Sequence, residues 1–246
     1  MKLSFAISFA LLPILGVQNA AAIPAVDSVS LKVRSTPGDS RGNPIRGEIE
    51  IRGEDALTYD VDCWAMLCKG MPTTMQKIGK KPANVNRQVM KGSAANKQPF
   101  KDPGKYGMKP SPPTNLWGGH KGWVSAEEFP FASTRDGGKS AILVGVTVNS
   151  QQEQKWSLRQ FYQKNKIQSY NRQTKKQDGT WFQITGFRAR PGTTAKVGPY
   201  CRAFNTKKPG NVCSAGTKVI GDWGFDVAEY AYVYNHSTKK FDYVGK

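Results

Sequence analysis

The sequence predicts an α+β fold with an antiparallel-rich sheet, a ββα-like unit, few helices and stabilising disulfide bonds. Three observations lead to this prediction. Short strand-like segments outnumber helical ones, one strand–turn–strand–helix succession lies in the middle of the chain, and four cysteines follow an export signal. At 246 residues the chain suits one domain with an extension.

The first 22 residues have the pattern of a signal peptide. Met1-Lys2 gives a positive start, residues 3–17 are apolar, and Ala20-Ala21-Ala22 offers small residues for cleavage. The apolar run is too short for a membrane-spanning helix, and no later segment is apolar enough to be one. We therefore expect a secreted, extracellular protein without a membrane partner, whose mature chain begins near Ile23.

The four cysteines predict two disulfide bonds in an exported chain. Three pairings of Cys63, Cys68, Cys201 and Cys213 can be drawn, and we favour the local ones, Cys63 with Cys68 and Cys201 with Cys213. No CxxC spacing occurs and the chain has only two histidines, so a cysteine-rich zinc site is not expected.

The first half of the chain is irregular in its patterning. Residues 28–34 and 48–52 alternate between apolar and polar and predict a hairpin or two edge strands. Residues 59–69 predict a short helix that contains the first two cysteines. The stretch 70–122 is rich in Gly, Pro, Lys and Asn without periodicity, which indicates a functional or mobile loop.

Regular structure is predicted again from Trp123 onward. Residues 141–148 are apolar on both faces and predict a central strand covered on both sides. Helical spacing follows over 149–164, where Leu158, Phe161 and Tyr162 share one face. The other expected elements are a strand over 123–131, a strand over 180–190, a turn-rich stretch over 191–222 and a hairpin formed by 227–234 and 240–244.

Charge narrows the class of partner. The chain has 36 basic and 18 acidic residues, a net charge of +18. This excess favours binding of a polyanion and opposes self-association, so we expect a monomer that binds nucleic acid. Acidic polysaccharide and an anionic membrane surface are the lesser alternatives.

Glu127 and Glu128 are two adjacent carboxylates in this basic chain. They repel each other unless a cation offsets their charge. Hydrolysis of a phosphodiester uses a carboxylate to activate water and a divalent ion to stabilise the leaving oxygen. Hard oxygen ligands suit Mg²⁺ or Mn²⁺, which are the cofactors we expect.

The stretch Glu127-Glu128-Phe129-Pro130-Phe131-Ala132-Ser133-Thr134, followed by Gly137-Gly138, resembles the D-E-[YFW]-P-[FY]-A-S signature of the NucA/NucB family of secreted deoxyribonucleases. The family's next motif, E-N-x-x-Q-G, is similar to Val148-Asn149-Ser150-Gln151-Gln152-Glu153 here, and Phe161-Tyr162 follows. The resemblance covers roughly residues 123–187. It departs from the family at Ala126, Glu127, Val148 and Glu153, which stand in place of Cys, Asp, Glu and Gly.

The resemblance implies roles for particular residues. Glu127 would be the general base or a metal ligand, and Glu128 a supporting catalytic acid. Asn149 and Gln152 would contact metal or phosphate at the start of the helix, and Glu153 would restore from the next turn the metal-binding carboxylate lost at Val148. Asn149 and Gln152 taken by themselves suit a helix cap and a first-turn amide.

Basic and aromatic residues near these positions predict contacts with the backbone and bases of DNA. The candidates for nucleic-acid binding are Lys121, Arg135, Lys139, Lys155, Trp156 and Arg159.

Two functions follow. The first is a secreted, metal-dependent deoxyribonuclease with little sequence preference, with RNA left open as a further substrate. Its nuclease-like domain would span 23–190, with a core at 123–190, and 191–246 would form a C-terminal extension. The alternative is a non-catalytic secreted protein that binds nucleic acid or another polyanion, as an interaction protein or toxin.

Overall fold

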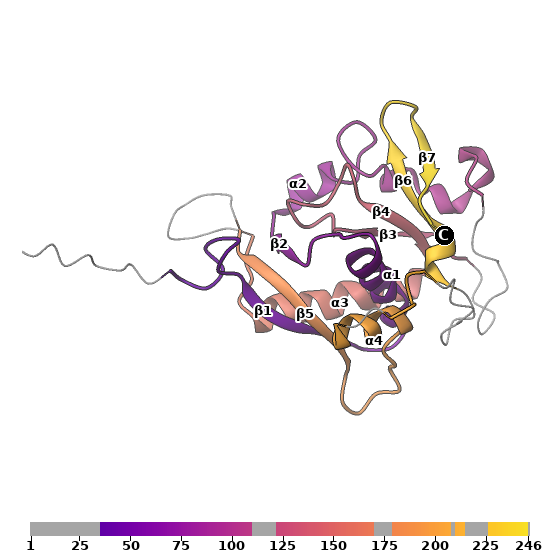
Figure 1. Ribbon diagram of the computed structural model, residues 1–246. Helices are drawn as coiled ribbons and strands as arrows, with labels where there is room; N and C mark the ends of the chain where they lie inside the picture. Colours follow the sequence, from indigo (N-terminus) through magenta and orange to yellow (C-terminus); the bar gives the residue numbers. More distant parts are fainter. Residues whose placement is uncertain (1–34, 110–121, 170–178, 208–209, 215–225, 246) are drawn as a thin grey trace, which may run out of the picture. The chain divides into compact units, whose positions relative to one another are not determined.

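The computed structural model describes residues 35–109, 122–169, 179–207, 210–214 and 226–245 (Figure 1). The predicted signal peptide and the segment 28–34 lie outside the described residues. Residues 35–246 form one compact unit, in which two small sheets enclose a central helix.

The first sheet has the strand order β1-β5-β2. Strand β1 (Ile45–Ile51) runs parallel to β5 (Trp181–Ala189), and β2 (Thr74–Gln76) pairs with β5 in the antiparallel sense. The strands predicted near 48–52 and over 180–190 are confirmed. The described partner of β1 is a strand more than a hundred residues away in the chain.

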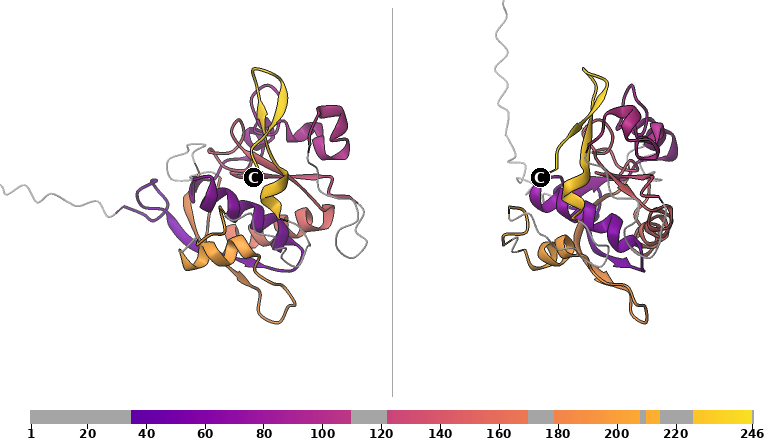
Figure 2. Two further views of the ribbon diagram at one scale, coloured as in Figure 1. Left: turned by 45° about the vertical axis from the view of Figure 1, so that its right-hand side comes forward. Right: turned by 90° about the vertical axis from the view of Figure 1, so that its right-hand side faces the viewer.

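Helix α1 (Asp55–Cys68) begins four residues before the predicted start at 59 and packs between the sheets (Figure 1, Figure 2). Every residue from Asp55 to Met66 is buried, because α1 contacts β1, β3, β4, α3 and α4. A helix that is buried on all sides is a core helix. Over the described ranges, no helix has the length and apolar character needed to cross a membrane.

The second sheet is antiparallel, with the strand order β3-β4-β6-β7. Strands β3 (Ser125–Phe129) and β4 (Ile142–Val146) are followed directly by α3 (Val148–Lys164), which confirms the predicted ββα-like unit. All five residues of β4 are buried, as the apolar run predicted. Strands β6 (Ala231–Asn235) and β7 (Lys240–Tyr243) form the predicted C-terminal hairpin, with a short 3₁₀ turn, Val227–Tyr230, before it.

The basic stretch after α1 is more ordered than its composition indicated. It contains β2, helix α2 (Lys80–Val85) and three 3₁₀ turns at Ala95–Lys97, Pro99–Lys101 and Gly104–Tyr106. Phe100 and Met108 pack with Leu143 and Tyr232 into a second apolar cluster on the outer face of the β3-β4-β6-β7 sheet. This stretch therefore covers the sheet, and it forms one wall of the site described below.

The favoured local cysteine pairing is wrong. The disulfide bonds join Cys63 to Cys201 and Cys68 to Cys213. Cys63 and Cys68 are five residues apart on α1, which separates their Cα atoms by at least ~7.5 Å along the axis, beyond the reach of a disulfide. The predicted Cys201–Cys213 bond within the C-terminal stretch therefore does not form either.

Residues 191–246 are part of the same unit and not a separate extension, because β6 pairs with β4 and α4 (Pro199–Thr206) packs on α1. The carboxylate of Asp60 on α1 accepts hydrogen bonds from the backbone N–H of Tyr200 (2.8 Å) and Cys201 (3.1 Å) at the start of α4. A Cβ atom at Gly198 would lie 2.3 Å from that carboxylate, so this close approach requires glycine.

Candidate functional site

A cavity of about 750 Å³ lies where β3, α3 and the basic stretch 77–101 meet. Five cationic side chains line it against two carboxylates, so its lining carries excess positive charge. The charged lining residues are Lys77, Arg87, Lys101, Lys155, Arg159, Glu127 and Glu128. A concave surface of this charge suits a phosphate-bearing ligand.

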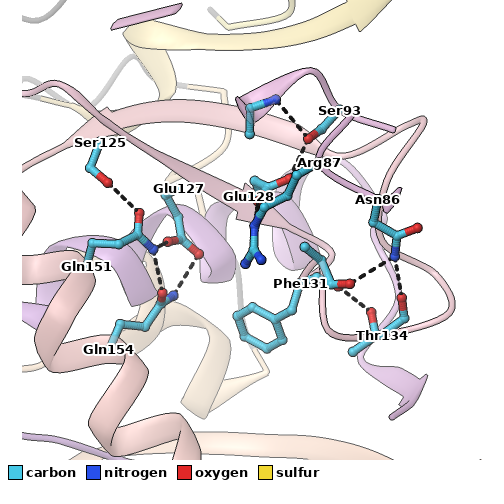
Figure 3. A network of polar contacts seen from close by, with 12 residues as sticks. Asn86, Arg87, Ser93, Ser125, Glu127, Glu128, Phe131, Thr134, Gln151 and Gln154 are labelled. Atoms are coloured by element: carbon cyan, nitrogen blue, oxygen red, sulfur yellow. Dashed lines mark hydrogen bonds and ion pairs between the residues drawn. The ribbon is translucent and has the colours of Figure 1, made fainter. Parts of the chain in front are cut away.

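Glu127 lies on β3 with its side chain toward α3, and only 1% of the residue is exposed. Two amides of α3 hold its carboxylate (Figure 3). Nε2 of Gln151 donates to Oε2 at 2.6 Å, and Nε2 of Gln154 donates to Oε1 at 2.7 Å. Gln151 is itself oriented by Ser125, whose hydroxyl donates to the amide oxygen. The position of the Glu127 carboxylate is therefore fixed before any ligand binds.

Asp62 of α1 lies behind Glu127 and is fully buried. Nε2 of Gln154 also donates to Oδ2 of Asp62, at 3.3 Å, while Oδ1 of Asp62 has no partner among the described residues. Burial, and then the charge of Glu127, raises the pKa of Asp62. Two neighbouring buried carboxyl groups cannot both ionise cheaply, so one of them retains a proton.

Burial also raises the pKa of Glu127 to about 7, against the hydrogen bonds from Gln154 and Gln151, which favour the ionised form. A carboxyl group with its pKa near neutrality can accept and release a proton at physiological pH. Ordinary solvent-exposed Glu residues cannot do both, because they stay ionised.

Glu128 is the next residue of β3 and points to the opposite face of the strand, as alternation requires. Its carboxylate accepts a hydrogen bond from Nε of Arg87 at 2.8 Å and another from the hydroxyl of Ser93. Burial raises the pKa of Glu128, and the charge of Arg87 opposes that rise. Glu128 therefore anchors the basic stretch to β3, and its charge is already paired.

The turn after β3 shapes the rim of the cavity. Nδ2 of Asn86 donates to the backbone oxygens of Ala132 and Thr134, both at 2.9 Å (Figure 3). The predicted Gly-Gly turn follows, and a Cβ at Gly137 would lie 2.2 Å from the backbone oxygen of Phe131. Glycine is thus needed there for steric reasons.

The predicted metal-binding set does not converge. Asn149 is exposed and outside the cavity lining, and Gln152 lines the cavity but makes no hydrogen bond to Glu127. Oε2 of Glu153 instead accepts from the backbone N–H of Asp55 at 3.2 Å, away from Glu127. The helix cap is Thr147, whose hydroxyl accepts from Ser150 N, and not Asn149.

The predicted nucleic-acid contacts divide into three groups. Lys155 and Arg159 line the cavity. Trp156 is 53% exposed beside them, with the Arg159 guanidinium 5.7 Å from its ring centre. Arg135 and Lys139 are exposed on the turn between β3 and β4, outside the cavity lining, and Lys121 lies outside the described residues.

Sequence reasoning missed several residues of the site. Gln151 and Gln154 lie on the inward face of α3 with Leu158 and Phe161, and an amide on an apolar face is a signal that could have identified them. No comparable signal marks Lys77 and Arg87, which come from the stretch without periodicity.

Neither the curated proteins nor the solved structures include a significant match to the chain. A family model, however, matches residues 62–175. The matched segment begins at Asp62 and includes the basic stretch, β3, β4 and α3, and so it extends further toward the N-terminus than the resemblance over 123–187. The ββα-like unit and its buried glutamate lie within this segment, so residues 62–175 are similar to the family described as deoxyribonuclease NucA/NucB, as the resemblance over 123–187 predicted.

Proposed function

We propose that this protein is an extracellular deoxyribonuclease that hydrolyses phosphodiester bonds of DNA in the cavity between β3 and α3. The similarity of residues 62–175 to deoxyribonuclease NucA/NucB supports a nuclease that acts on DNA. The observation that carries the proposal is the Glu127 carboxyl group, buried, held by two amides and set in a cavity lined mainly by cations.

Glu127 acts as the general base. In its ionised form it takes a proton from a water molecule, and the water oxygen forms a bond to phosphorus while the bond to an ester oxygen breaks. The departing oxygen takes a proton from solvent. Gln151 and Gln154 keep the carboxylate in one orientation, which removes the entropic cost of positioning it during the reaction.

The cations of the cavity hold the phosphate backbone. Lys155 and Arg159 line the α3 side of the cavity, and Lys77 and Arg87 line the opposite wall. Contacts of this kind are made to phosphate and carry no sequence information. We therefore propose a nuclease with little sequence preference.

The use of a divalent metal ion as cofactor stays a prediction. Among the described residues no three His, Cys, Asp or Glu side chains stand close enough to hold one. Both oxygens of Glu127 already accept amide protons, and of the other predicted ligands only Gln152 lines the cavity. These residues do not form a metal cage, so we assign no step of the reaction to Mg²⁺ or Mn²⁺.

Secretion rests on two observations. Two disulfide bonds occur within the described residues, as is usual for proteins of oxidising compartments. Residues 1–22 have the signal-peptide pattern. A net charge of +18 supports DNA as the partner and a monomer as the state in solution.

Digestion of supercoiled plasmid by the purified mature protein tests the proposal. Glu127→Gln should lower the rate by about 10²- to 10⁴-fold, because the amide cannot accept the proton. Glu48→Gln, at an exposed acid on β1, is the matched control and should cut at the wild-type rate. Cleavage by Glu127→Gln at the wild-type rate, or no cleavage by the wild type with Mg²⁺, Mn²⁺ or EDTA, contradicts the proposal.

One observation favours a second candidate, the non-catalytic DNA-binding protein. Val148 lines the cavity and is 49% exposed at the start of α3, at the position where the resembled family carries Glu. A cavity that has lost this acid would still bind DNA through its cations. Salt-sensitive DNA binding without cleavage under any of the three metal conditions would select this candidate.

A further inference from the structure

Lys77 is a half-buried cation that has no acidic partner among the residues that the structure describes. It lies just after β2 and lines the cavity. Its ammonium group donates to the backbone oxygens of Ile78 (2.9 Å) and Ser133 (3.3 Å) and stands 5.0 Å from the ring centre of Tyr162. Burial lowers the pKa of Lys77 to about 8, so the charged form still predominates at pH 7.

The ammonium group of Lys77 has one N–H donor that makes no hydrogen bond to the described residues. An ammonium group has three N–H donors, and the two carbonyl oxygens take two of them. Backbone carbonyls and a ring face hold the group in place without neutralising it. Burial of a positive charge is energetically costly unless an anion lies next to it, and no described residue supplies that anion to Lys77.

Arg87 has a similar surplus. Its Nε donates to Glu128, which leaves the four N–H bonds of the two terminal nitrogens. Figure 3 shows the guanidinium group extending from Glu128 with no dashed contact at those nitrogens. The side chain is 47% exposed and lines the same cavity as Lys77.

One turn holds both cations. Lys77 is bonded to the backbone oxygen of Ser133, while Asn86, the residue before Arg87, is bonded to the backbone oxygens on either side, of Ala132 and Thr134. The two cations therefore stand on segments fixed to consecutive peptide groups. Both side chains line the same cavity.

We infer that Lys77 and Arg87 together bind one backbone phosphate of DNA directly, with no divalent ion between protein and phosphate. The guanidinium offers paired N–H donors to two phosphate oxygens, and the ammonium offers a point charge to a third. This inference rests on the proposed function for the identity of the ligand. It adds which residues hold the phosphate and that they do so without metal.

Binding of a short fluorescein-labelled DNA duplex, measured by anisotropy in buffer with EDTA over a series of salt concentrations, tests this assignment. The wild type should bind in EDTA. Lys77→Met should weaken binding about tenfold and lower the magnitude of the salt slope by about 1, because one phosphate contact is lost. Lys240→Met, an equal loss of charge at an exposed residue of β7 outside the cavity, should leave the affinity within about twofold and the slope nearly unchanged.

A double variant guards against misfolding of an Arg87 variant, which would leave the buried Glu128 unpaired. Arg87→Met with Glu128→Gln removes both charges and should weaken binding as Lys77→Met does. Binding that requires Mg²⁺, or equal affinities for Lys77→Met and Lys240→Met, would overturn the assignment. Cleavage is not scored in this assay, so a protein that fails as a nuclease still answers whether these two residues bind phosphate.

Discussion

The two disulfide bonds should stabilise the fold in a non-additive way, because the loops that they close overlap. Cys63–Cys201 closes a loop of 138 residues and Cys68–Cys213 one of 145. Once Cys63 and Cys201 are joined, the shortest path between Cys68 and Cys213 runs through that bond. It comprises residues 63–68 and 201–213, so the second bond closes an effective loop of about 17 residues. The second bond therefore constrains the unfolded chain much less than its own separation indicates.

The chain-entropy relation converts these lengths to free energies. A loop of about 17 residues is worth about 3 kcal/mol, and one of about 140 residues about 5 kcal/mol. Removing either bond alone should lower the free energy of unfolding by about 3 kcal/mol, and removing both by about 8 kcal/mol. The loss from both together should thus exceed the sum of the single losses by about 2 kcal/mol.

Guanidinium denaturation followed by tryptophan fluorescence measures these losses. The first variant is Cys68→Ser with Cys213→Ser, since both residues are only partly buried and a serine there leaves no large cavity. The second is Cys63→Ala with Cys201→Ala. A thiol titration in denaturant should find no free thiol in the first variant. Free Cys63 and Cys201 thiols would show local pairing, and losses that simply add would refute the overlapping loops.

Three shorter predictions concern protonation and capping. Cleavage should fall about tenfold per pH unit below about pH 7, the pKa to which burial raises Glu127, because the base must be ionised; a rate that is flat from about pH 5 to 8 would contradict this role. Burial raises the pKa of Asp60 from 3.8 to about 8, so its stabilising contribution is complete below about pH 4 and is lost as the pH rises through about 8. Asp60→Asn, which keeps an acceptor for the start of α4, should therefore gain in unfolding free energy relative to the wild type as the pH rises, and a constant difference would refute the shift. Thr147→Ala should cost about 1 kcal/mol of unfolding free energy by removing the cap bond to Ser150, measured by urea denaturation, whereas an unchanged midpoint would show that the cap is unimportant.

The predictable part of the fold was local. The apolar run at β4 and the helical spacing of α3 each determine one element from neighbouring residues, and the structure has both. The parallel pairing of β1 with β5 and the disulfide bonds from α1 to the C-terminal stretch depend on contacts between residues more than a hundred positions apart. No pattern within a short window encodes such contacts.

The candidate site divides in the same way. Glu127 stood out because two adjacent acids are unusual in a basic chain and the surrounding residues resemble a known signature. Its true partners, Gln151 and Gln154, are each one or two positions from the predicted Gln152, and on a helix a shift of one position turns a side chain by 100°. Lys77 and Arg87 reach the cavity only because the basic stretch folds over β3. The composition of that stretch gives no indication of where it packs.

Hydrogen exchange on the mature protein with a short DNA duplex in EDTA tests most directly whether DNA binds between β3 and α3. The amides of the turn 131–135 and of the first turns of α3 should exchange more slowly when the duplex is present. Slower exchange confined to the β6–β7 hairpin or to β1, with those amides unchanged, would place DNA elsewhere and contradict the account.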